Sequence, residues 1–203
     1  MTTGQLPRLG TRAASTREAL LTSAREVFTV SGFTESSIAD VVAGAGASVG
    51  SLYHHFGGKS ELYMALFEEY QQRQETRAAA AVRTARSEDE ADPVTLFVAG
   101  ARAYLEGCWV ERDLARLFLA GGGPPGFELA ARRRYREWTG RNSALLKQGP
   151  DDDGEPWAAA LVIVLTTVIS EAGHEVAVCE DEDSANRLAR ELLVLIARIA
   201  DSA

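Results

Sequence analysis

Residues 36–59 read SSIADVVAGAGASVGSLYHHFGGK, and the organisation of the whole chain can be worked out from this stretch. Ser37 and Ser48 each stand directly before a short run with apolar residues at helical spacing, where a serine oxygen can accept a free backbone N–H. Gly46 lies between the two runs, and Gly57-Gly58 follows the second. Two short helices joined by a glycine turn are typical of a helix-turn-helix, whose second helix usually enters the major groove of DNA.

A third helix is expected upstream, from about Thr16 to Ser31, where Gly32 should end it and Phe33 should fold back onto the same core. Its apolar face consists of Leu20, Leu21, Ala24, Val27 and Phe28. The three helices would form a DNA-binding head over residues 15–58. Residues 1–14 are polar and are expected to be a flexible arm, either a loose terminus or a source of phosphate and minor-groove contacts through its arginines.

Residues 59–203 show helical patterns and no β pattern, so the fold class predicted for the chain is all-α. A long helix should start near Lys59 and end at the acidic stretch SEDEADP, residues 87–93. The loops GGGPPG, residues 121–126, and GPDDDGEP, residues 149–156, separate later helices. These later helices are expected at 93–109, 111–120, 127–146, 157–179 and 184–200.

The last two predicted helices differ from the others in hydrophobicity. Trp157 to about Cys179 is apolar almost all round, so its first half should be buried on more than one side. The final helix carries a heptad-like seam of Leu188, Leu192, Leu195 and Ile199. Two such helices can form half of an intermolecular four-helix bundle, which predicts a homodimer; a core within one chain is the alternative.

Charge is distributed unevenly along the chain, whose net charge is −8. Residues 1–59 hold five basic and four acidic side chains, so the remainder carries −9. This balance excludes a protein that coats nucleic acid indiscriminately and suits a head that approaches phosphate.

The longest apolar run, Trp157–Ile169, is too short to span a membrane, and no signal peptide precedes the head, so a cytoplasmic protein is expected. Cys108 and Cys179 are expected to be buried thiols, with a disulfide or redox switch as the alternative.

Residues 32–66, GFTESSIADVVAGAGASVGSLYHHFGGKSELYMAL, resemble the DNA-binding head of TetR-family transcriptional regulators. The resemblance covers about residues 16–66, and the remaining two thirds is similar only in architecture. It implies a homodimeric repressor that binds a palindromic double-stranded DNA operator. It also implies that residues 59–203 form a ligand-binding and dimerisation domain, and that a small molecule entering it lowers operator affinity.

Nine residues are the predicted DNA contacts of the head. Helix starts favour phosphate at the two capping serines, while Gly50 lets the duplex approach the backbone closely. Tyr53, His54 and Lys59 would reach phosphates, and Val49 and Ser51 would face base edges, the valine against a thymine methyl group. The complete set is Ser36, Ser37, Ser48, Val49, Gly50, Ser51, Tyr53, His54 and Lys59.

The recognition helix departs from common patterns of DNA readout, because Ser48 to His55 contains no Arg or Lys. It cannot form the bidentate arginine–guanine contact, so specificity would depend on the methyl contact, on DNA shape or on the arginines of the arm. The family often has alanine where Val42 stands and valine where Ala47 stands. We interpret the two differences as compensating, because the larger side chain at Val42 offsets the smaller one at Ala47 within the same core.

A small-molecule site is expected between the helices of residues 93–120 and 127–179, although the sequence does not identify the effector. Each aromatic residue there is equally compatible with plain core packing. The arginine run 132–134 could attract an anionic ligand or simply form a solvated helix face. The predicted lining, apolar with a few hydroxyl groups, is Phe97, Tyr104, Trp109, Phe118, Trp138, Thr166, Thr167 and Ser170.

Other functions find less support in the sequence. An all-helical enzyme or metal-binding bundle would need a nucleophile elbow, a phosphate loop, a CxxC pair or a second ExxH motif, and none is present. Glu171 and His174 are spaced as metal ligands can be, but a hydrogen-bonded helix histidine explains them better. No catalytic residue, cofactor or metal is therefore predicted. Control by a partner protein and activation instead of repression stay open as alternatives.

Overall fold

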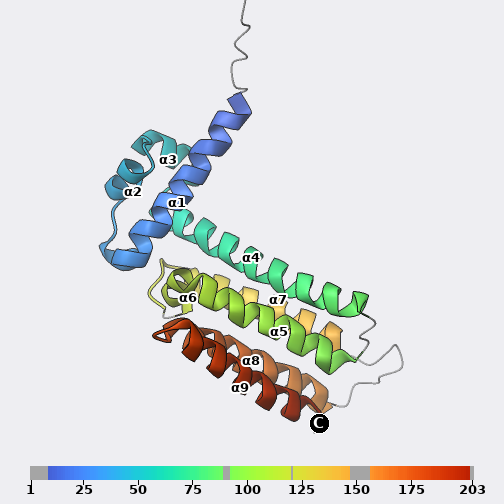
Figure 1. The fold of residues 1–203 in the computed structure, drawn as a ribbon. Helices are drawn as coiled ribbons and strands as arrows, with labels where there is room; N and C mark the ends of the chain where they lie inside the picture. Colours follow the sequence, from blue (N-terminus) through green and yellow to red (C-terminus); the bar gives the residue numbers. More distant parts are fainter. Residues whose placement is uncertain (1–8, 89–91, 120, 147–155, 202–203) are drawn as a thin grey trace, which may run out of the picture. The chain divides into compact units, whose positions relative to one another are not determined.

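The computed structural model describes residues 9–88, 92–119, 121–146 and 156–201, and all regular structure in these ranges is α-helical (Figure 1). The predicted all-α fold class is confirmed. The helices begin and end within three residues of the predicted bounds, except for the first helix. They are α1 (Leu9–Glu35), α2 (Ile38–Gly44), α3 (Val49–Phe56), α4 (Lys59–Ser87), α5 (Pro93–Val110), α6 (Arg112–Leu119), α7 (Phe127–Leu146), α8 (Pro156–Val178) and α9 (Glu182–Asp201).

The first helix starts earlier than the sequence indicated. It begins at Leu9, so Thr16 lies inside the helix and does not cap it, and part of the expected arm is helical. Ala13 and Ala14 favour this extension because alanine has the highest helix propensity. The predicted break is confirmed: Gly32 has φ 69° and ψ −179°, a left-handed conformation that interrupts the helix before Phe33. Residues 1–8 of the predicted arm lie outside the described part.

The chain divides into two compact units. The first comprises residues 1–69 with 122–127, and the second comprises residues 70–121 with 128–203, so the single helix α4 contributes to both. In the first unit, α1 packs against α2 and α3. Tyr63 lies edge-on to three aromatic rings, with centroids at 5.3, 5.3 and 5.4 Å, which anchors the start of α4 in this core. The three rings belong to Phe28, Phe33 and Phe127.

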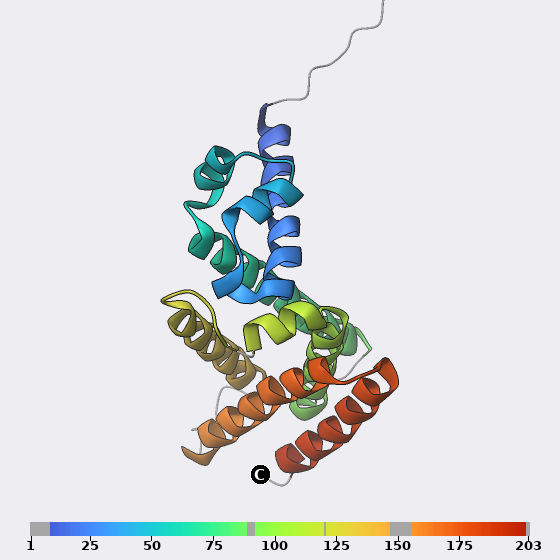
Figure 2. The same cartoon turned by 90° about the vertical axis from the view of Figure 1, so that its left-hand side faces the viewer.

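In the second unit, α5 packs against α6, α8 and α9. α8 and α9 lie side by side in both ribbon views (Figures 1 and 2). The fully buried apolar residues of this unit include Leu105 of α5, Leu114 of α6, Leu165 of α8 and Ile196 of α9. The core is therefore built across α5, α6, α8 and α9.

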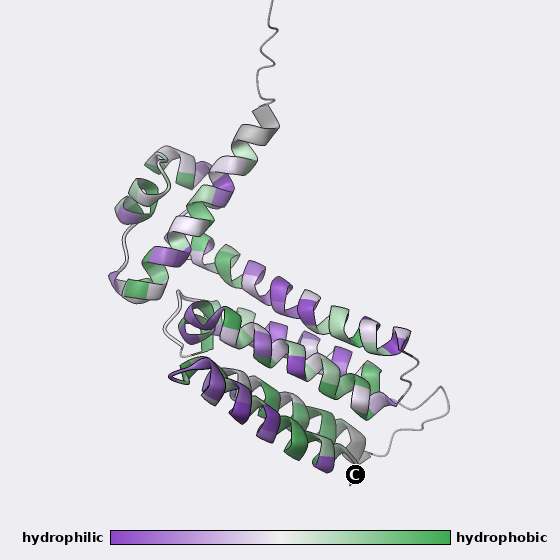
Figure 3. Cartoon of the chain, in the orientation of Figure 1, coloured by the Kyte–Doolittle hydropathy of each residue, from purple (hydrophilic) through white to green (hydrophobic). Residues whose placement is uncertain are grey.

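α8 is more exposed than its composition suggested. Ala159–Val178 is long and apolar enough to cross a membrane by length and composition, with a mean hydropathy of 1.6, although the sequence pattern indicated a shorter apolar run. Leu165, Ile169 and Val176 are buried in the unit, whereas Ile163 and Val164 on the same helix are about half exposed. Burial on more than one side is thus wrong for the single chain, since Ile163 and Val164 lie outside its core. Figure 3 shows the ribbon of α8 as mostly green, that is, hydrophobic.

Both cysteines are free thiols. Cys108 is fully buried, as predicted, and burial raises the pKa of its thiol to about 11. Cys179 is only partly buried, and it follows the end of α8 instead of lying inside it. A buried thiol with a raised pKa is a poor nucleophile, so Cys108 functions as a packing residue.

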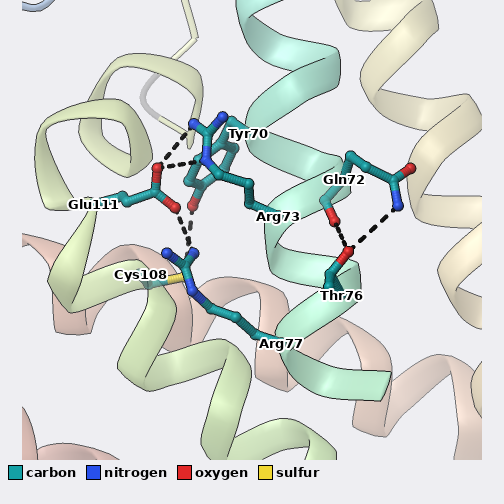
Figure 4. Close-up of polar contacts among 7 residues, drawn as sticks. All are labelled: Tyr70, Gln72, Arg73, Thr76, Arg77, Cys108 and Glu111. Carbon is teal, nitrogen blue, oxygen red and sulfur yellow. Dashed lines mark hydrogen bonds and ion pairs between the residues drawn. The ribbon is translucent and has the colours of Figure 1, made fainter. Parts of the chain in front are cut away.

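A buried carboxylate ties α4 to the end of α5 (Figure 4). Glu111 follows α5 and is 5% exposed. It accepts a hydrogen bond from Arg73 Nε at 2.8 Å and pairs with Arg77 one turn further along α4. A carboxylate buried to this degree needs such partners, because desolvation without them would be costly.

We expect Glu111→Gln to lower the free energy of unfolding by about 2 kcal/mol, because two arginines that are about one third exposed lose their interaction with the charge of Glu111. Urea unfolding followed by circular dichroism measures the change. Glu106→Gln, on the exposed side of α5, is the control and should have little effect. A stability equal to that of the control would show that the pair does not stabilise this junction.

Candidate DNA-binding head

Each helix of the helix-turn-helix begins at a capping serine. Ser37 is extended, with φ −122° and ψ 151°, and its Oγ accepts the backbone N–H of Asp40 at 3.1 Å. Ser48 does the same for Ser51, also at 3.1 Å. Both predicted caps are confirmed, and each fixes the direction in which a short helix leaves its loop.

The turn between the helices depends on glycine at specific points. α2 ends at Gly44, where an added Cβ would lie 2.4 Å from the Oγ of Ser23. Gly46 follows with φ 60°, two residues after the helix has ended. α3 ends at Gly57, which has φ 90° and donates its N–H to the carbonyl of Tyr53 at 3.0 Å. A side chain at Gly44 would therefore displace the hydroxyl of Ser23.

The inner faces of α2 and α3 pack on α1. Val41, Val42 and Leu52 are buried, and the Oγ of Ser23 in α1 donates to the carbonyl of Val41 at 2.8 Å. Phe56, the last residue of α3, is only half-buried. The guanidinium of Arg17 covers its ring at 5.3 Å from the centroid, so a cation–π contact replaces full burial.

The outer face of α3 holds most of the predicted DNA contacts. Val49 is 48% exposed and Tyr53 is 52% exposed. Ser48, Gly50 and His54 are exposed beside them, and Ser51 is half-buried. Six of the nine predicted residues thus belong to one short helix and its cap, while Ser37 is half-buried at the start of α2.

Ser36 and Lys59 have partners inside the head. Ser36 is 6% exposed, and its hydroxyl donates to the carbonyl of Phe33 at 2.8 Å. Lys59 Nζ donates to the carbonyl oxygens of Thr34 at 3.2 Å and Ser36 at 2.5 Å, and it lies 4.6 Å from the centroid of the Phe33 ring. The start of α4 is thereby tied to the segment that joins α1 to α2. Contact of either residue with DNA stays a prediction.

The second unit contains a cavity of about 290 Å³, and two of the eight predicted ligand residues, Phe97 and Trp138, line it. Tyr104 packs edge-on against Trp138 at 5.0 Å. Thr166, which is buried, bonds at 2.9 Å to Asn142, a further lining residue. Tyr104 and Thr166 thus contact lining residues without lining the cavity themselves, and Trp109, Phe118, Thr167 and Ser170 are outside the lining as well.

The residues outside the lining have other neighbours. Trp109 lies beneath the guanidinium of Arg112, Phe118 packs on Tyr70, and the Thr167 hydroxyl lies 2.7 Å from the Tyr135 hydroxyl. The lining that the sequence did not indicate comes largely from α4 and the end of α7. Small residues line the cavity from both helices, Ala78 and Ala79 on α4 and Gly100 and Ala101 on α5. They mark a close approach of the helices, since an added Cβ at Gly100 would lie 3.2 Å from Val82.

The head is thus a helix-turn-helix, in which a short serine-capped helix packs on two others through one face and exposes the opposite face. Residues 20–66 match the family model described as bacterial regulatory proteins, tetR family. The chain is 33% identical over 82 residues to the HTH-type transcriptional regulator TtgR of Pseudomonas putida, covering 40% of this chain and 37% of that protein. It is 35% identical over 68 residues to the regulator UidR of Escherichia coli, covering 34% of this chain and 35% of that protein. The match therefore spans little more than a third of these relatives.

Solved structures extend the similarity along the chain. A TetR-family transcriptional regulator from Pectobacterium atrosepticum is 26% identical with a TM-score of 0.62, covering 95% of both chains. A TetR-like regulator from Rhodococcus sp. RHA1 has the same fold, with a TM-score of 0.68 at 22% identity over 96% of this chain and 97% of that one. Residues 20–66 thus match a TetR-family domain, as the resemblance implied, and the chain as a whole is similar to solved TetR-family regulators.

We expect Lys59→Met to lower the free energy of unfolding by about 1 kcal/mol, because the ammonium loses two carbonyl acceptors and leaves them unpaired. Urea unfolding measures this, with Glu18→Gln on the exposed side of α1 as the control. Unchanged stability together with lost DNA binding would instead make Lys59 a phosphate contact without a structural role.

Proposed function

We propose that the chain is a homodimeric repressor, which binds a palindromic operator through its two heads and leaves the DNA when a small molecule binds its body. The observation that carries this proposal is the outer face of α3, which has no partner in the described part of the chain. The match of residues 20–66 to the TetR-family model supports DNA binding by this face. A cytoplasmic location follows from the same proposal, because operators lie in that compartment.

The open space around Gly50 gives the most specific support for contact with DNA. Within the protein, an added Cβ at this position would meet nothing closer than the Oγ of Ser48 at 3.9 Å. The fold therefore tolerates a side chain there, and glycine in a helix interior costs stability relative to alanine. A glycine that the fold does not need is explained by a surface that approaches from outside, which we propose to be the DNA backbone.

The remaining contacts are assigned by exposure. The exposed hydroxyl of Tyr53 and the imidazole of His54 reach phosphates, and Ser48 offers the start of α3 to the same strand. Val49 and Ser51 face base edges, since they occupy the first turn of the recognition helix. Ser37 and Lys59 would add contacts from the starts of α2 and α4.

Dimerisation is proposed through α8 and α9. On α9, Leu195 is 53% exposed and Ile199 is 42% exposed, while the residues that face the core are Ala185, Leu193 and Ile196. In the predicted seam, Leu188 and Leu192 are half-buried, and Leu195 and Ile199 are exposed, so the chain's own core covers it only in part. With the exposed residues Ile163 and Val164 of α8, the seam forms an apolar surface that a second copy can cover.

Release of DNA requires a link between body and head. α4 runs without interruption from Lys59, bound in the head, to the cavity lining at Arg83 and Arg86. A ligand that changes the packing of α4 can shift the population of DNA-binding heads, provided that it binds one arrangement of this helix more tightly.

We expect Gly50→Ala to keep or raise the stability of the protein, by up to about 1 kcal/mol, while it weakens operator binding at least roughly tenfold. The operator is first selected from random DNA fragments, and affinity is then measured by fluorescence anisotropy. Gly140→Ala is the matched control, since this helical glycine in α7 also has open space around it. Full operator affinity in Gly50→Ala would refute close approach of DNA at this position.

The double variant Leu195→Glu/Ile199→Glu should be monomeric in analytical ultracentrifugation, because charges on the seam oppose burial by a second copy. Val110→Glu is the control, since Val110 is 64% exposed and lies on α5, outside the seam. A double variant that stays dimeric would place the interface elsewhere.

A further inference from the structure

The cavity of the second unit combines an apolar floor with a charged rim. Phe97, Trp138 and Ile169 are among its apolar residues, contributed by α5, α7 and α8. Its volume of about 290 Å³ lies at the small end of ligand sites, which are usually about 300–1,000 Å³. An occupant of this space is a small molecule with an apolar body.

Three arginines and one glutamate belong to the lining in the described part of the chain. Glu75 and Arg141 form an ion pair at 3.0 Å, which neutralises one positive charge and fixes the guanidinium of Arg141. Arg83 and Arg86 are exposed on the last turns of α4, and neither forms an ion pair within the described residues. Among the charged residues of the lining, Arg83 and Arg86 therefore contribute two positive charges that no lining carboxylate pairs with.

These two charges are notable because the body as a whole is acidic. Two arginines three residues apart lie on one face of a helix, so both guanidinium groups can approach one carboxylate. A cationic ligand would be repelled here, and a neutral one would gain less from the guanidinium groups than an anion would. The nearby amide of Asn142 is held by its hydrogen bond to Thr166 and adds a polar group on the α7 side.

We propose that this cavity binds a small organic anion, with an aromatic or aliphatic body against Phe97 and Trp138 and a carboxylate at Arg83 and Arg86. This inference rests on the proposed function in one respect only: it takes the molecule bound in the cavity to be the effector that releases DNA. The charge preference itself concerns binding to the cavity and can be measured without DNA.

The test compares isosteric anionic and neutral probes on the full chain by isothermal titration calorimetry. The probes are 2-naphthoate with 2-naphthamide, and octanoate with octanamide. At least one anion should bind roughly tenfold more tightly than its amide. In the double variant Arg83→Gln/Arg86→Gln, the anion and its amide should bind with nearly equal affinity. Arg102→Gln, an exposed arginine on α5 outside the lining, should keep it.

A second variant checks that binding occurs in this cavity. Ala101→Leu fills the wall formed by α5 and should abolish binding of anion and amide together. Equal affinity for anion and amide, binding of neither anion, or a preference unchanged in the double arginine variant would each overturn the proposal. Anisotropy with operator DNA is a separate measurement: an anion that binds the cavity without releasing DNA leaves the charge preference intact and contradicts ligand-induced release.

Discussion

The packing of α3 on α1 and α2 is the constraint on which the head depends. A helix of eight residues is too short to be stable alone, since isolated helices need about 12 residues or more. The buried side chain of Leu52 holds it in place, and Ser48 and Gly57 satisfy backbone groups at its two ends. Because these interactions use one face and both ends, the other face is left free, and function can be assigned to it.

The single helix α4 belongs to both units. Its first turn is bound by the carbonyl groups that accept from Lys59, and its middle is bound by Glu111 through Arg73 and Arg77. Its last turns line the cavity. A helix bound at two points transmits a shift more readily than a loop would, because its own hydrogen bonds resist local bending. The same covalent segment thus connects the proposed ligand site with the proposed DNA contact.

The elements of this fold could be predicted from the sequence because helix signals are local. Caps at Ser37 and Ser48 and the break at Gly32 depend on backbone groups within a few residues. The cavity was harder to predict, since its rim joins Arg83 of α4 to Arg141 of α7, and no local pattern records which faces of distant helices meet. The burial of Ser36 was missed for the same reason: its position depends on the carbonyl of Phe33 and on Lys59.

The recognition helix has no lysine or arginine, and this affects how such a head responds to its surroundings. Binding that releases few condensed counterions varies little with salt concentration, and it gives little attraction to DNA of arbitrary sequence. A head that attaches mainly through helix ends, hydroxyl groups and a valine methyl spends less time on unrelated DNA. A genome contains many competing non-specific sites. The preference for the operator then depends on weak binding to unrelated DNA as much as on strong binding to the operator.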